Sequence, residues 1–354
     1  MLQRKTVDDA YSRWMEADGP ESGIAISSRV RIARNLAGKP FPHQLNNEKA
    51  EEVVSAVREL VESGSLTWQT GVLELGLLNE LSAVERQILV DKHLISPDLI
   101  NNFENKAVVL RDDEVISVMI NEEDHLRIQC LLSGLQLNEA WRLINQVDDG
   151  FESVLDYAFS EQLGYLTACP TNVGTGLRAS VMLHLPALVM VKQLKEVLNA
   201  ISKVGLTARG LFGEGTEALG DLYQISNQIT LGLVEEDIIS NLIAVVRKII
   251  SQEKATRTAL FNDRQHFVKD RVYRAYGILK NAHILSSEEA MRLFSDLRLG
   301  VEMNLLSGIP IKLLNVLMVR IQPAFLTKLA GWEMPSHRRD VFRAKLIRKE
   351  FKNL

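Results

Sequence analysis

The stretch CPTNVGTGLRASV, residues 169–181, determines how the chain around it is interpreted. The residues that lead into it, GYLTAC (164–169), predict a strand, which Pro170 and two glycines then break in a small loop. From Arg178 the apolar residues recur at helical spacing, which predicts a helix to about Val204. In this prediction a helix N-terminus lies beside the loop.

A helix that begins at such a loop favours the binding of an anion. Its first backbone N–H groups are unpaired and the positive end of its dipole faces outward, while Arg178 adds a fixed positive charge. The predicted chemistry is phosphate binding. The alternative is ordinary turn chemistry, in which Thr171, Asn172 and Thr175 cap the backbone. Arginines and carboxylates at other strand ends favour the phosphate interpretation.

The composition is that of a soluble globular protein. The chain has 354 residues, enough for two domains or for one large domain with an appendage, and it is 46% hydrophobic and 24% charged. A net charge of −4 does not favour direct nucleic-acid binding, and no apolar run approaches the ~20 residues that span a membrane. The two cysteines, Cys130 and Cys169, and the lack of an apolar signal region predict a cytoplasmic protein.

The sequence predicts both strands and helices up to about Ala255, and mainly helices after it. We expect residues 1–22 to wrap the surface, residues 23–255 to form one domain, and residues 256–354 to form a helical domain. Strands are predicted at 23–36, 107–132, 206–212 and 223–232, and helices at 48–62, 84–99, 137–159 and from Glu235 onward. A capping box at Ser286 and Glu289 opens one of the later helices.

Arginines recur at strand ends. Arg29 and Arg31 are two residues apart, so on a strand they project from one face, either as a solvated basic surface or as a phosphate clamp. Arg127, Arg178 and Arg209 lie at or near the ends of other predicted strands or helices. Phosphoryl transfer needs cations that neutralise the polyphosphate, and the arginine fork suits phosphate oxygens. Magnesium would then sit on the phosphates and water, without a protein metal site.

Carboxylates would serve the acceptor of the phosphoryl group. The acidic turn at Glu122, Glu123 and Asp124 is either solvated or holds a cationic acceptor, and the glycine-rich loop 213–221, expected to be mobile, carries Glu214 and Glu217. A guanidinium has a pKa above about 12 and needs carboxylates to align it and remove its proton. A hydroxyl acceptor would need one base. The P-loop, G-x-G-x-x-G, H-R-D and D-F-G motifs are absent, which excludes P-loop enzymes and ordinary protein kinases.

Four segments, in order, resemble the catalytic domain of the phosphagen (guanidino) kinases: SSRVRIAR (27–34), VMINEEDHLRI (118–128), CPTNVGTGLRASV (169–181) and RGLFGEGTE (209–217). The resemblance implies an α+β fold with an antiparallel sheet flanked by helices, followed here by a helical C-terminal domain. It implies ATP and Mg²⁺ as cofactors. It also implies that Glu122, Glu123 and Glu214 align and deprotonate the guanidine, while the Cys169 thiolate acts electrostatically.

The same resemblance assigns the nucleotide site residue by residue. The residues expected to bind ATP are Ser27, Ser28, Arg29, Val30, Arg31, His93, Arg127, Arg178, Ala179, Ser180, Val181, Met182, Arg209, Gly210, Leu211, Phe212, Gly213 and Glu214. For His93, near the end of a predicted helix, a surface or capping role is the alternative. Thr230 departs from the pattern, because small-guanidine kinases usually place a phosphate-binding arginine after ISN.

A second departure concerns the acceptor. Only about 22 residues precede the first motif, where small-guanidine kinases carry a helical domain that encloses the acceptor, so we expect a more open pocket. This architecture resembles the bacterial protein-arginine kinases, a branch of the family. Their R-D-x-x-R-A phosphoarginine motif matches Arg339, Asp340, Arg343 and Ala344.

The resemblance to that branch implies a specific activity. The enzyme would transfer the ATP γ-phosphate to arginine side chains of proteins, including repressors and misfolded proteins, with an adaptor-activator and the Clp ATPase and protease as partners. We also expect a homodimer. The alternatives are a kinase of free guanidines and a non-catalytic adaptor that docks phosphoarginine through its C-terminal helix.

Overall fold

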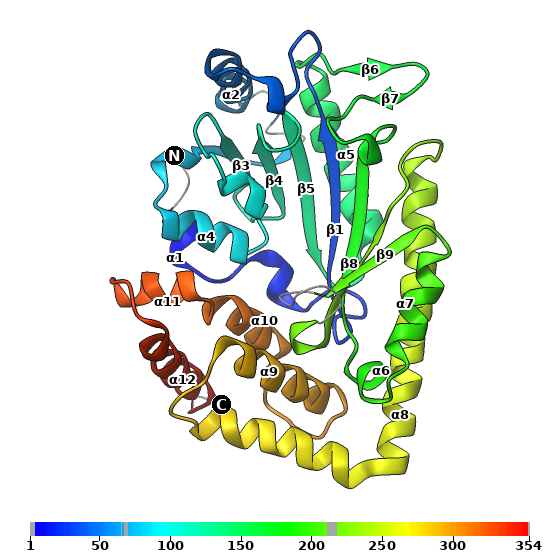
Figure 1. Cartoon of the computed structure of the whole chain (residues 1–354), viewed down its shortest axis with the longest axis vertical. Coiled ribbons are helices and arrows are strands. Elements are labelled where there is room, and N and C mark those ends of the chain that lie inside the picture. The colour runs from blue at the N-terminus through cyan, green and yellow to red at the C-terminus, as the bar shows by residue number, and fades with distance from the viewer. Residues whose placement is uncertain (1–3, 65, 67–69, 211–217, 353–354) are drawn as a thin grey trace.

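The computed structural model describes residues 4–64, 66, 70–210 and 218–352. An antiparallel sheet of eight strands runs through this part of the chain, in the order β2-β3-β4-β5-β1-β8-β10-β9 (Figure 1). Its strands are β1 (Ala25–Arg34), β2 (Leu73–Leu77), β3 (Ala107–Arg111), β4 (Ile116–Ile120), β5 (Leu126–Ser133), β8 (Leu177–His184), β9 (Leu206–Gly210) and β10 (Leu222–Asn227). A small separate hairpin pairs β6 (Phe159–Ser160) with β7 (Gly164–Tyr165). The predicted antiparallel sheet is confirmed.

Helices surround the sheet and continue into a helical C-terminal region, as predicted. They are α1 (Arg4–Asp8), α2 (Asn47–Glu62), α4 (Ala83–Asp91), α5 (Leu137–Glu152), α6 (Pro186–Met190), α7 (Leu194–Ser202), α8 (Glu235–Asn281), α9 (Ser287–Glu302), α10 (Ile311–Arg320), α11 (Pro323–Ala330) and α12 (Ser336–Lys352). Apolar side chains of α2, α5 and the first half of α8 form one core with one face of the sheet. Short 3-10 turns include η1 (Arg13–Glu16), η4 (Pro97–Ile100) and η6 (Leu219–Asp221).

Strand alternation divides β1 between two environments. Val30 and Ile32 are fully buried in the core under α5, whereas Arg29 and Arg31 project from the opposite face. Arg34 lies on the core side, only 2% exposed, and its Nε and Nη2 donate to Asp148 Oδ2 on α5 at 3.0 and 2.6 Å. Its guanidinium also stacks on the Tyr165 ring, 3.4 Å from the centroid. Arg34 is therefore a structural residue, unlike the arginines on the opposite face of the strand.

Replacing Arg34 by Met is expected to destabilise the fold by about 3 kcal/mol, because Asp148 would remain buried without its partner. The free energy of unfolding in urea measures the change. The matched control is Arg31→Met on the same strand, where the replaced guanidinium has a buried Nε without a hydrogen-bond partner, and this variant should not be destabilised. If both variants lost the same free energy of unfolding, Arg34 would not differ from Arg31 in its structural role, and this prediction would be wrong.

The opposite face of the sheet is covered at its two ends. Helix α4 and the turn η4 cover β3 and β4, and the C-terminal helices cover the ends of β1, β5 and β8. The N-terminal segment lies between the sheet and those helices, where Trp14 is 1% exposed and Met15 is fully buried. The prediction that residues 1–22 wrap the surface is therefore wrong at its centre, because these two apolar side chains complete the C-terminal core.

The predicted helix from Arg178 to Val204 is also wrong. Residues 177–184 form the central strand β8, and the helical segments α6 and α7 follow it. The strand is buried on both faces, so its apolar residues do not alternate cleanly with polar ones, and part of the pattern matched a helix. Pro186 at the start of α6 marks the break. No helix N-terminus follows the loop at 169–176, and the predicted helix-dipole phosphate cradle is not formed.

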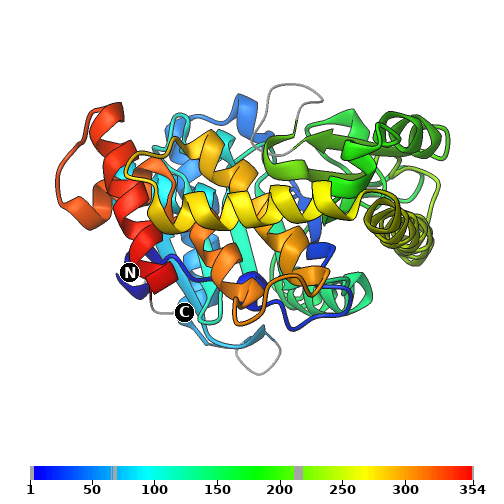
Figure 2. The ribbon, with the colours of Figure 1, turned by 90° about the horizontal axis from the view of Figure 1, so that it is seen from below.

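Other boundaries differ by smaller amounts. The strand predicted over 164–169 is limited to β7, and the helix predicted over 137–159 ends at Glu152. The helix predicted over 84–99 is α4 followed by the separate turn η4. The position of the predicted domain boundary, Ala255, lies within α8, which continues to Asn281 with non-helical backbone angles at Arg264. The chain bends there, and Figure 2 shows the second half of α8 crossing the C-terminal helices.

Within the described residues no single helix is long and apolar enough to cross a membrane. The bent pair α10 and α11, at 79° to each other, meets the length and composition criteria when the two are taken together. Their apolar side chains, such as Leu317 and Phe325, are buried in the C-terminal core.

Candidate active site

Four arginines from three adjacent strands share one face of the sheet, and we name this cluster the arginine face: Arg29 and Arg31 of β1, Arg127 of β5 and Arg178 of β8. Arg31 lies directly opposite Arg178 in the β1–β8 register, and Arg127 lies opposite Ala33 in the β1–β5 register. Directly opposed side chains are about 5 Å apart at Cβ, so these cations repel one another. The register of the sheet therefore brings together these four arginines, which come from three segments far apart in the sequence.

Burial and mutual repulsion lower the pKa values of Arg29, Arg31 and Arg178. Burial lowers the pKa of Arg29 to about 10, with a further contribution from Arg127. The pKa of Arg31 lies well below its ordinary value through burial and through the charges of Arg29, Arg127 and Arg178. The Nε of Arg31 is buried and has no hydrogen-bond partner. Such a site is costly without a ligand and favourable once an anion occupies it.

Among the described residues, Glu122 supplies the closest counter-charge to the arginine face. Arg127 Nη1 donates to both of its carboxylate oxygens, at 2.7 and 2.5 Å, and Ser96 Oγ donates at 2.5 Å. Burial acts to raise the pKa of Glu122, but Arg127, Ser96 and the Glu123 N–H outweigh it and the pKa is lowered. A carboxylate held this way positions Arg127 and is poorly placed to accept a proton. Sequence analysis missed Ser96, which no motif includes.

Glu123 is the accessible carboxylate at the edge of the arginine face. Its side chain is 43% exposed and lies 3.8 Å from Arg127 Nη2. Partial burial raises its pKa, which Arg127 opposes and which Asp124, Glu122 and Asp98 reinforce. An exposed carboxylate with a raised pKa beside a cationic face is suited to act as a general base.

Asp124 connects this acidic turn to the loop that carries Cys169. Its Oδ1 accepts hydrogen bonds from Asn35 Nδ2 and from the Ala168 N–H, both at 2.7 Å. Cys169 Sγ lies 3.0 Å from Thr171 Oγ1. The charges of Cys169 and Glu123 both act to raise the pKa of Arg178, against the stronger effects of burial, Arg209 and Arg127. Glu123 and Cys169 therefore lie close enough to Arg178 to interact with it electrostatically.

Thr230 stands where small-guanidine kinases usually place an arginine, and it has a different role here. Its buried hydroxyl lies 3.0 Å from the carbonyl oxygen of Thr171 and 2.8 Å from that of Val173, and it can donate to either. The side chain thus fastens the Cys169 loop to the segment after β10. It supplies no charge to the arginine face.

Thr230→Val is expected to lower kcat about tenfold, because a buried loop carbonyl loses its hydroxyl donor, a change of about 1.4 kcal/mol. The KM for ATP should stay unchanged, since the arginine face is left intact. Steady-state kinetics with ATP varied at saturating acceptor separate the two constants. A rise in KM for ATP with unchanged kcat would assign Thr230 to nucleotide binding instead.

The residues predicted to bind ATP do not all lie on the same face of the sheet. Ser27, Ser180 and Met182 lie with Arg29 and His93 around a small cavity of about 20 Å³, which Leu131 and Gln224 complete. The side chains of Ser28, Val30, Ala179 and Val181 lie on the other face, three of them in the core under the helices. Ser28 Oγ, for example, donates to Gly134 O at 2.8 Å. The resemblance assigned whole motifs, but strand alternation lets only every second side chain reach the arginine face.

His93 and Gln224 line the same cavity. His93 has a left-handed backbone with φ of 61°, and its pKa is lowered to about 3 by burial and then by Arg29. A neutral imidazole beside the arginines is the result. Gln224 Oε1 accepts a hydrogen bond from Arg29 Nη2 at 2.7 Å. Sequence analysis placed Gln224 on a strand but gave it no role, although its alternation with the buried Tyr223 and Ile225 marks the face it occupies.

Arg209 and its neighbours occupy the sheet edge. Arg209 is exposed on the edge strand β9, opposite Gln224, and it lowers the pKa of Arg178. Gly210 ends the strand. Leu211, Phe212, Gly213 and Glu214, together with Glu217 of the same predicted loop, lie outside the described residues.

The C-terminal motif lies on α12, away from the arginine face. Arg343 is 2% exposed and donates to the carbonyl oxygens of Ile321 and Leu285, and to Asp340 Oδ1 at 2.5 Å. Arg339 is half-buried, and its Nη1 donates to Met334 O. Ala344 is fully buried. Arg339 and Asp340 are thus the accessible polar members of the motif.

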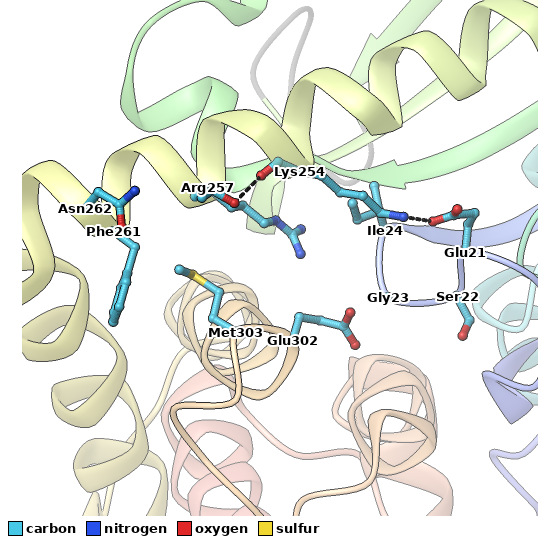
Figure 3. A pocket seen from close by; sticks show the side chains of 11 residues that line it. Glu21, Ser22, Gly23, Ile24, Lys254, Arg257, Phe261, Asn262, Glu302 and Met303 are labelled. Atoms are coloured by element: carbon cyan, nitrogen blue, oxygen red, sulfur yellow. Dashed lines mark hydrogen bonds and ion pairs between the residues drawn. The ribbon is translucent and has the colours of Figure 1, made fainter.

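The described residues contain no group of three His, Cys, Asp or Glu side chains that could hold a metal ion. A roomier cavity, of about 610 Å³, lies apart from the arginine face, between α8, the end of α9 and the turn before β1. In Figure 3 the side chains of Arg257 and Glu302 point into it, and the Lys254–Glu21 ion pair closes one side.

Comparisons with known proteins fit this geometry. The family model of the ATP:guanido phosphotransferase C-terminal catalytic domain matches residues 52–256, and that of the protein-arginine kinase McsB C-terminal domain matches residues 265–354. A protein-arginine kinase of Pelotomaculum thermopropionicum is 67% identical over 354 residues, which cover 100% of this chain and 99% of that protein. The chain belongs to the protein-arginine kinase family.

Other relatives of the family agree in sequence or in fold. A protein-arginine kinase of Desulforamulus reducens is 56% identical, with 100% of this chain and 99% of that protein covered. The crystal structure of a lombricine kinase matches with a TM-score of 0.60 and 23% identity, over 71% of this chain and 73% of that one, which shows the shared fold. The family model begins at residue 52, so Arg29 and Arg31 precede the matched region.

Proposed function

We propose that this chain transfers the γ-phosphoryl group of ATP to the guanidinium of arginine side chains in proteins. The observation that carries the proposal is the buried, unpartnered Nε of Arg31, which faces Arg178 and lies among cations that lower its pKa. An anion with several charges is the ligand that would relieve this repulsion. ATP, with magnesium on its phosphates, supplies that charge and the phosphoryl group to be transferred.

The arginine face would hold the polyphosphate and stabilise the charge that develops during transfer. Arg29 and Arg31 come from β1, which lies between β5 and β8, so their backbone is fixed by both neighbouring strands. Arg127 is held in place by Glu122. Preorganised cations of this kind need no rearrangement when the reaction occurs, which makes them effective in a partly buried site.

Glu123 would accept the proton of the acceptor. A guanidinium nitrogen forms the P–N bond to the γ-phosphorus while the bond from that phosphorus to the β,γ-bridging oxygen breaks and ADP leaves with the electron pair. The nitrogen loses a proton, which passes to the exposed carboxylate of Glu123. Cys169, fixed beside it through Asp124 and Ala168, would steady the positive charge of the guanidinium electrostatically.

Proteins are favoured over free guanidines as acceptors by the family assignment and by the C-terminal region matched over residues 265–354. The test is mass spectrometry of casein incubated with the protein and MgATP, handled at neutral pH because the P–N bond is acid-labile. Phosphoarginine on casein supports the proposal. Phosphate on added free arginine alone would favour the small-molecule kinase, and transfer to neither acceptor would favour the docking adaptor.

We propose further that the motif on α12 binds phosphoarginine. Arg339 and Asp340 are its accessible polar residues, and the burial of Arg343 orders the helix that presents them. Arg339→Ala should abolish binding of a phosphoarginine peptide and spare ATP binding. Because Arg343 also bonds two backbone carbonyl groups, its replacement would weaken the helix packing and is the poorer test. Unchanged peptide affinity in Arg339→Ala would reject the assignment.

The remaining expectations rest on the family resemblance alone. They are a homodimer, a cytoplasmic location, repressor and misfolded-protein substrates, an adaptor-activator, and delivery of phosphorylated proteins to the Clp ATPase and protease. Sedimentation velocity tests the dimer, and pull-down of phosphorylated casein with a Clp ATPase tests the delivery.

A further inference from the structure

Exposed apolar side chains gather beside the Cys169 loop. Seven large ones, between 44% and 57% exposed, come from the β6–β7 hairpin, from the second residue after α7 and from the segment between β10 and α8. We name them the apolar rim: Phe159, Leu163, Val204, Ile229, Leu231, Leu233 and Val234. Single exposed apolar residues are normal, but a group of this size on one border of a site marks an interaction surface.

Backbone contacts show that the rim is continuous with the loop. Gly174, in the Cys169 loop, exchanges hydrogen bonds with Tyr165 of the hairpin. A Cβ added at Gly174 would lie 2.9 Å from the Leu231 Cα, and one added at Gly205 would lie 3.3 Å from Ile229 Cδ1. The hairpin, the Cys169 loop and the segment before α8 are thus neighbours, and Figure 1 shows the hairpin and the start of α8 at the same corner.

Negative charge borders the apolar rim. The first turn of α8, directly after Val234, carries Glu235, Glu236 and Asp237, and Glu161 is exposed at the hairpin tip. A surface with apolar side chains and flanking carboxylates complements a polypeptide segment that combines apolar residues with arginine. It does not complement ATP, which is anionic and lies over the arginine face in our proposal.

We propose that the apolar rim binds the residues that flank the acceptor arginine in a protein substrate, and that it selects segments in which those residues are apolar. The proposal rests on the function proposed above, because it assumes that the acceptor is part of a polypeptide. A folded protein keeps such segments inside, so the rim favours arginines in exposed, extended, partly apolar stretches. The rim acts on substrate binding and leaves the phosphoryl transfer step unchanged.

The test uses two peptides, each with one arginine, flanked either by Leu and Phe or by Ser and Gly. The variant Leu163→Ser, Leu231→Ser removes one apolar side chain from each side of the rim. The matched control is Ile284→Ser, Leu329→Ser, which removes exposed apolar side chains, 65% and 42% exposed, from the C-terminal region. Kinetics with MgATP and fluorescence anisotropy of labelled peptides are measured for all three proteins.

The expected result is a KM about tenfold higher for the apolar peptide in the rim variant, with kcat unchanged. The polar peptide, the KM for ATP and the control variant should show no change. Equal kinetics for both peptides in the unmodified chain, or equal losses for both in the rim variant, would overturn the proposal. A rim variant that changes the sedimentation coefficient would also overturn it, by assigning the rim to contact between copies.

Anisotropy separates this inference from the function on which it rests. If neither peptide is phosphorylated but the apolar peptide binds about tenfold more weakly to the rim variant, the rim proposal stands and the kinase proposal fails. If both peptides are phosphorylated equally, the kinase proposal stands and the rim proposal fails.

Discussion

Replacement of Glu123 by Gln is expected to lower kcat for arginine phosphorylation by about 10³-fold, within the range for loss of a general base. The substitution keeps the size of the side chain and its capacity to accept a hydrogen bond from Arg127 Nη2, 3.8 Å away in the present structure. It removes the site for the proton. The KM for ATP should change little, because the arginine face is intact. Phosphoarginine formed on casein per unit time measures the effect.

The pH dependence gives an independent control for Glu123. Its pKa is raised, and the base must be deprotonated to act, so the rate is fully present above this pKa and is lost as the pH falls through it. This acidic limb should lie at higher pH than for an ordinary glutamate and should be absent from the residual activity of Glu123→Gln. Glu122→Gln should differ, because it releases Arg127 and therefore raises the KM for ATP. An acidic limb that persists in Glu123→Gln would assign the base elsewhere.

Arg31→Met is expected to have opposite effects on activity and stability. Loss of the central cation should lower kcat/KM for ATP by about 10³-fold, as for other arginines that neutralise a transferring phosphoryl group. The ligand-free protein should become more stable, with a midpoint of thermal unfolding about 2 °C higher, because the substitution removes a buried unpartnered donor and the repulsion among four arginines.

Thermal unfolding with and without MgATP tests both halves of this prediction. The unmodified chain should gain stability when the nucleotide is added and Arg31→Met should gain much less. Arg178→Met, directly across the β1–β8 register, should behave in the same way. A ligand-free Arg31→Met protein that melts below the unmodified chain would show that the arginine has a structural partner, as Arg34 has.

The sequence predicted the sheet well where one face is polar and failed where both faces are apolar. Arg29 and Arg31 alternate with Val30 and Ile32, so β1 was evident from its pattern. In β8 both faces are buried, and Val181 begins an apolar spacing that a helix would also show. Whether this segment forms a strand or a helix depends on pairing with the neighbouring strands, and the register of that pairing cannot be obtained from one segment of sequence.

The chemistry of the site was predictable in part, for a related reason. Arginines and acidic residues stand out in a sequence, so the charged members were found. Ser96 was missed and Gln224 was left without a role because the contribution of each is a hydrogen bond to a distant partner, to Glu122 and to Arg29 respectively. Such pairings depend on tertiary geometry, and neutral residues carry no local signal of them.

The position of the N-terminal segment sets an order of events during synthesis of the chain. Trp14 and Met15 are buried against the C-terminal helices, and Met15 O accepts a hydrogen bond from Asn315 Nδ2, 300 residues later. At about 5–20 residues per second, the ribosome needs about 15–60 s to supply that partner. Until then the sheet would expose Ile26, Leu131 and Met182, which these elements later cover. A nascent chain of this protein therefore passes through a period in which it is itself a candidate for chaperone binding.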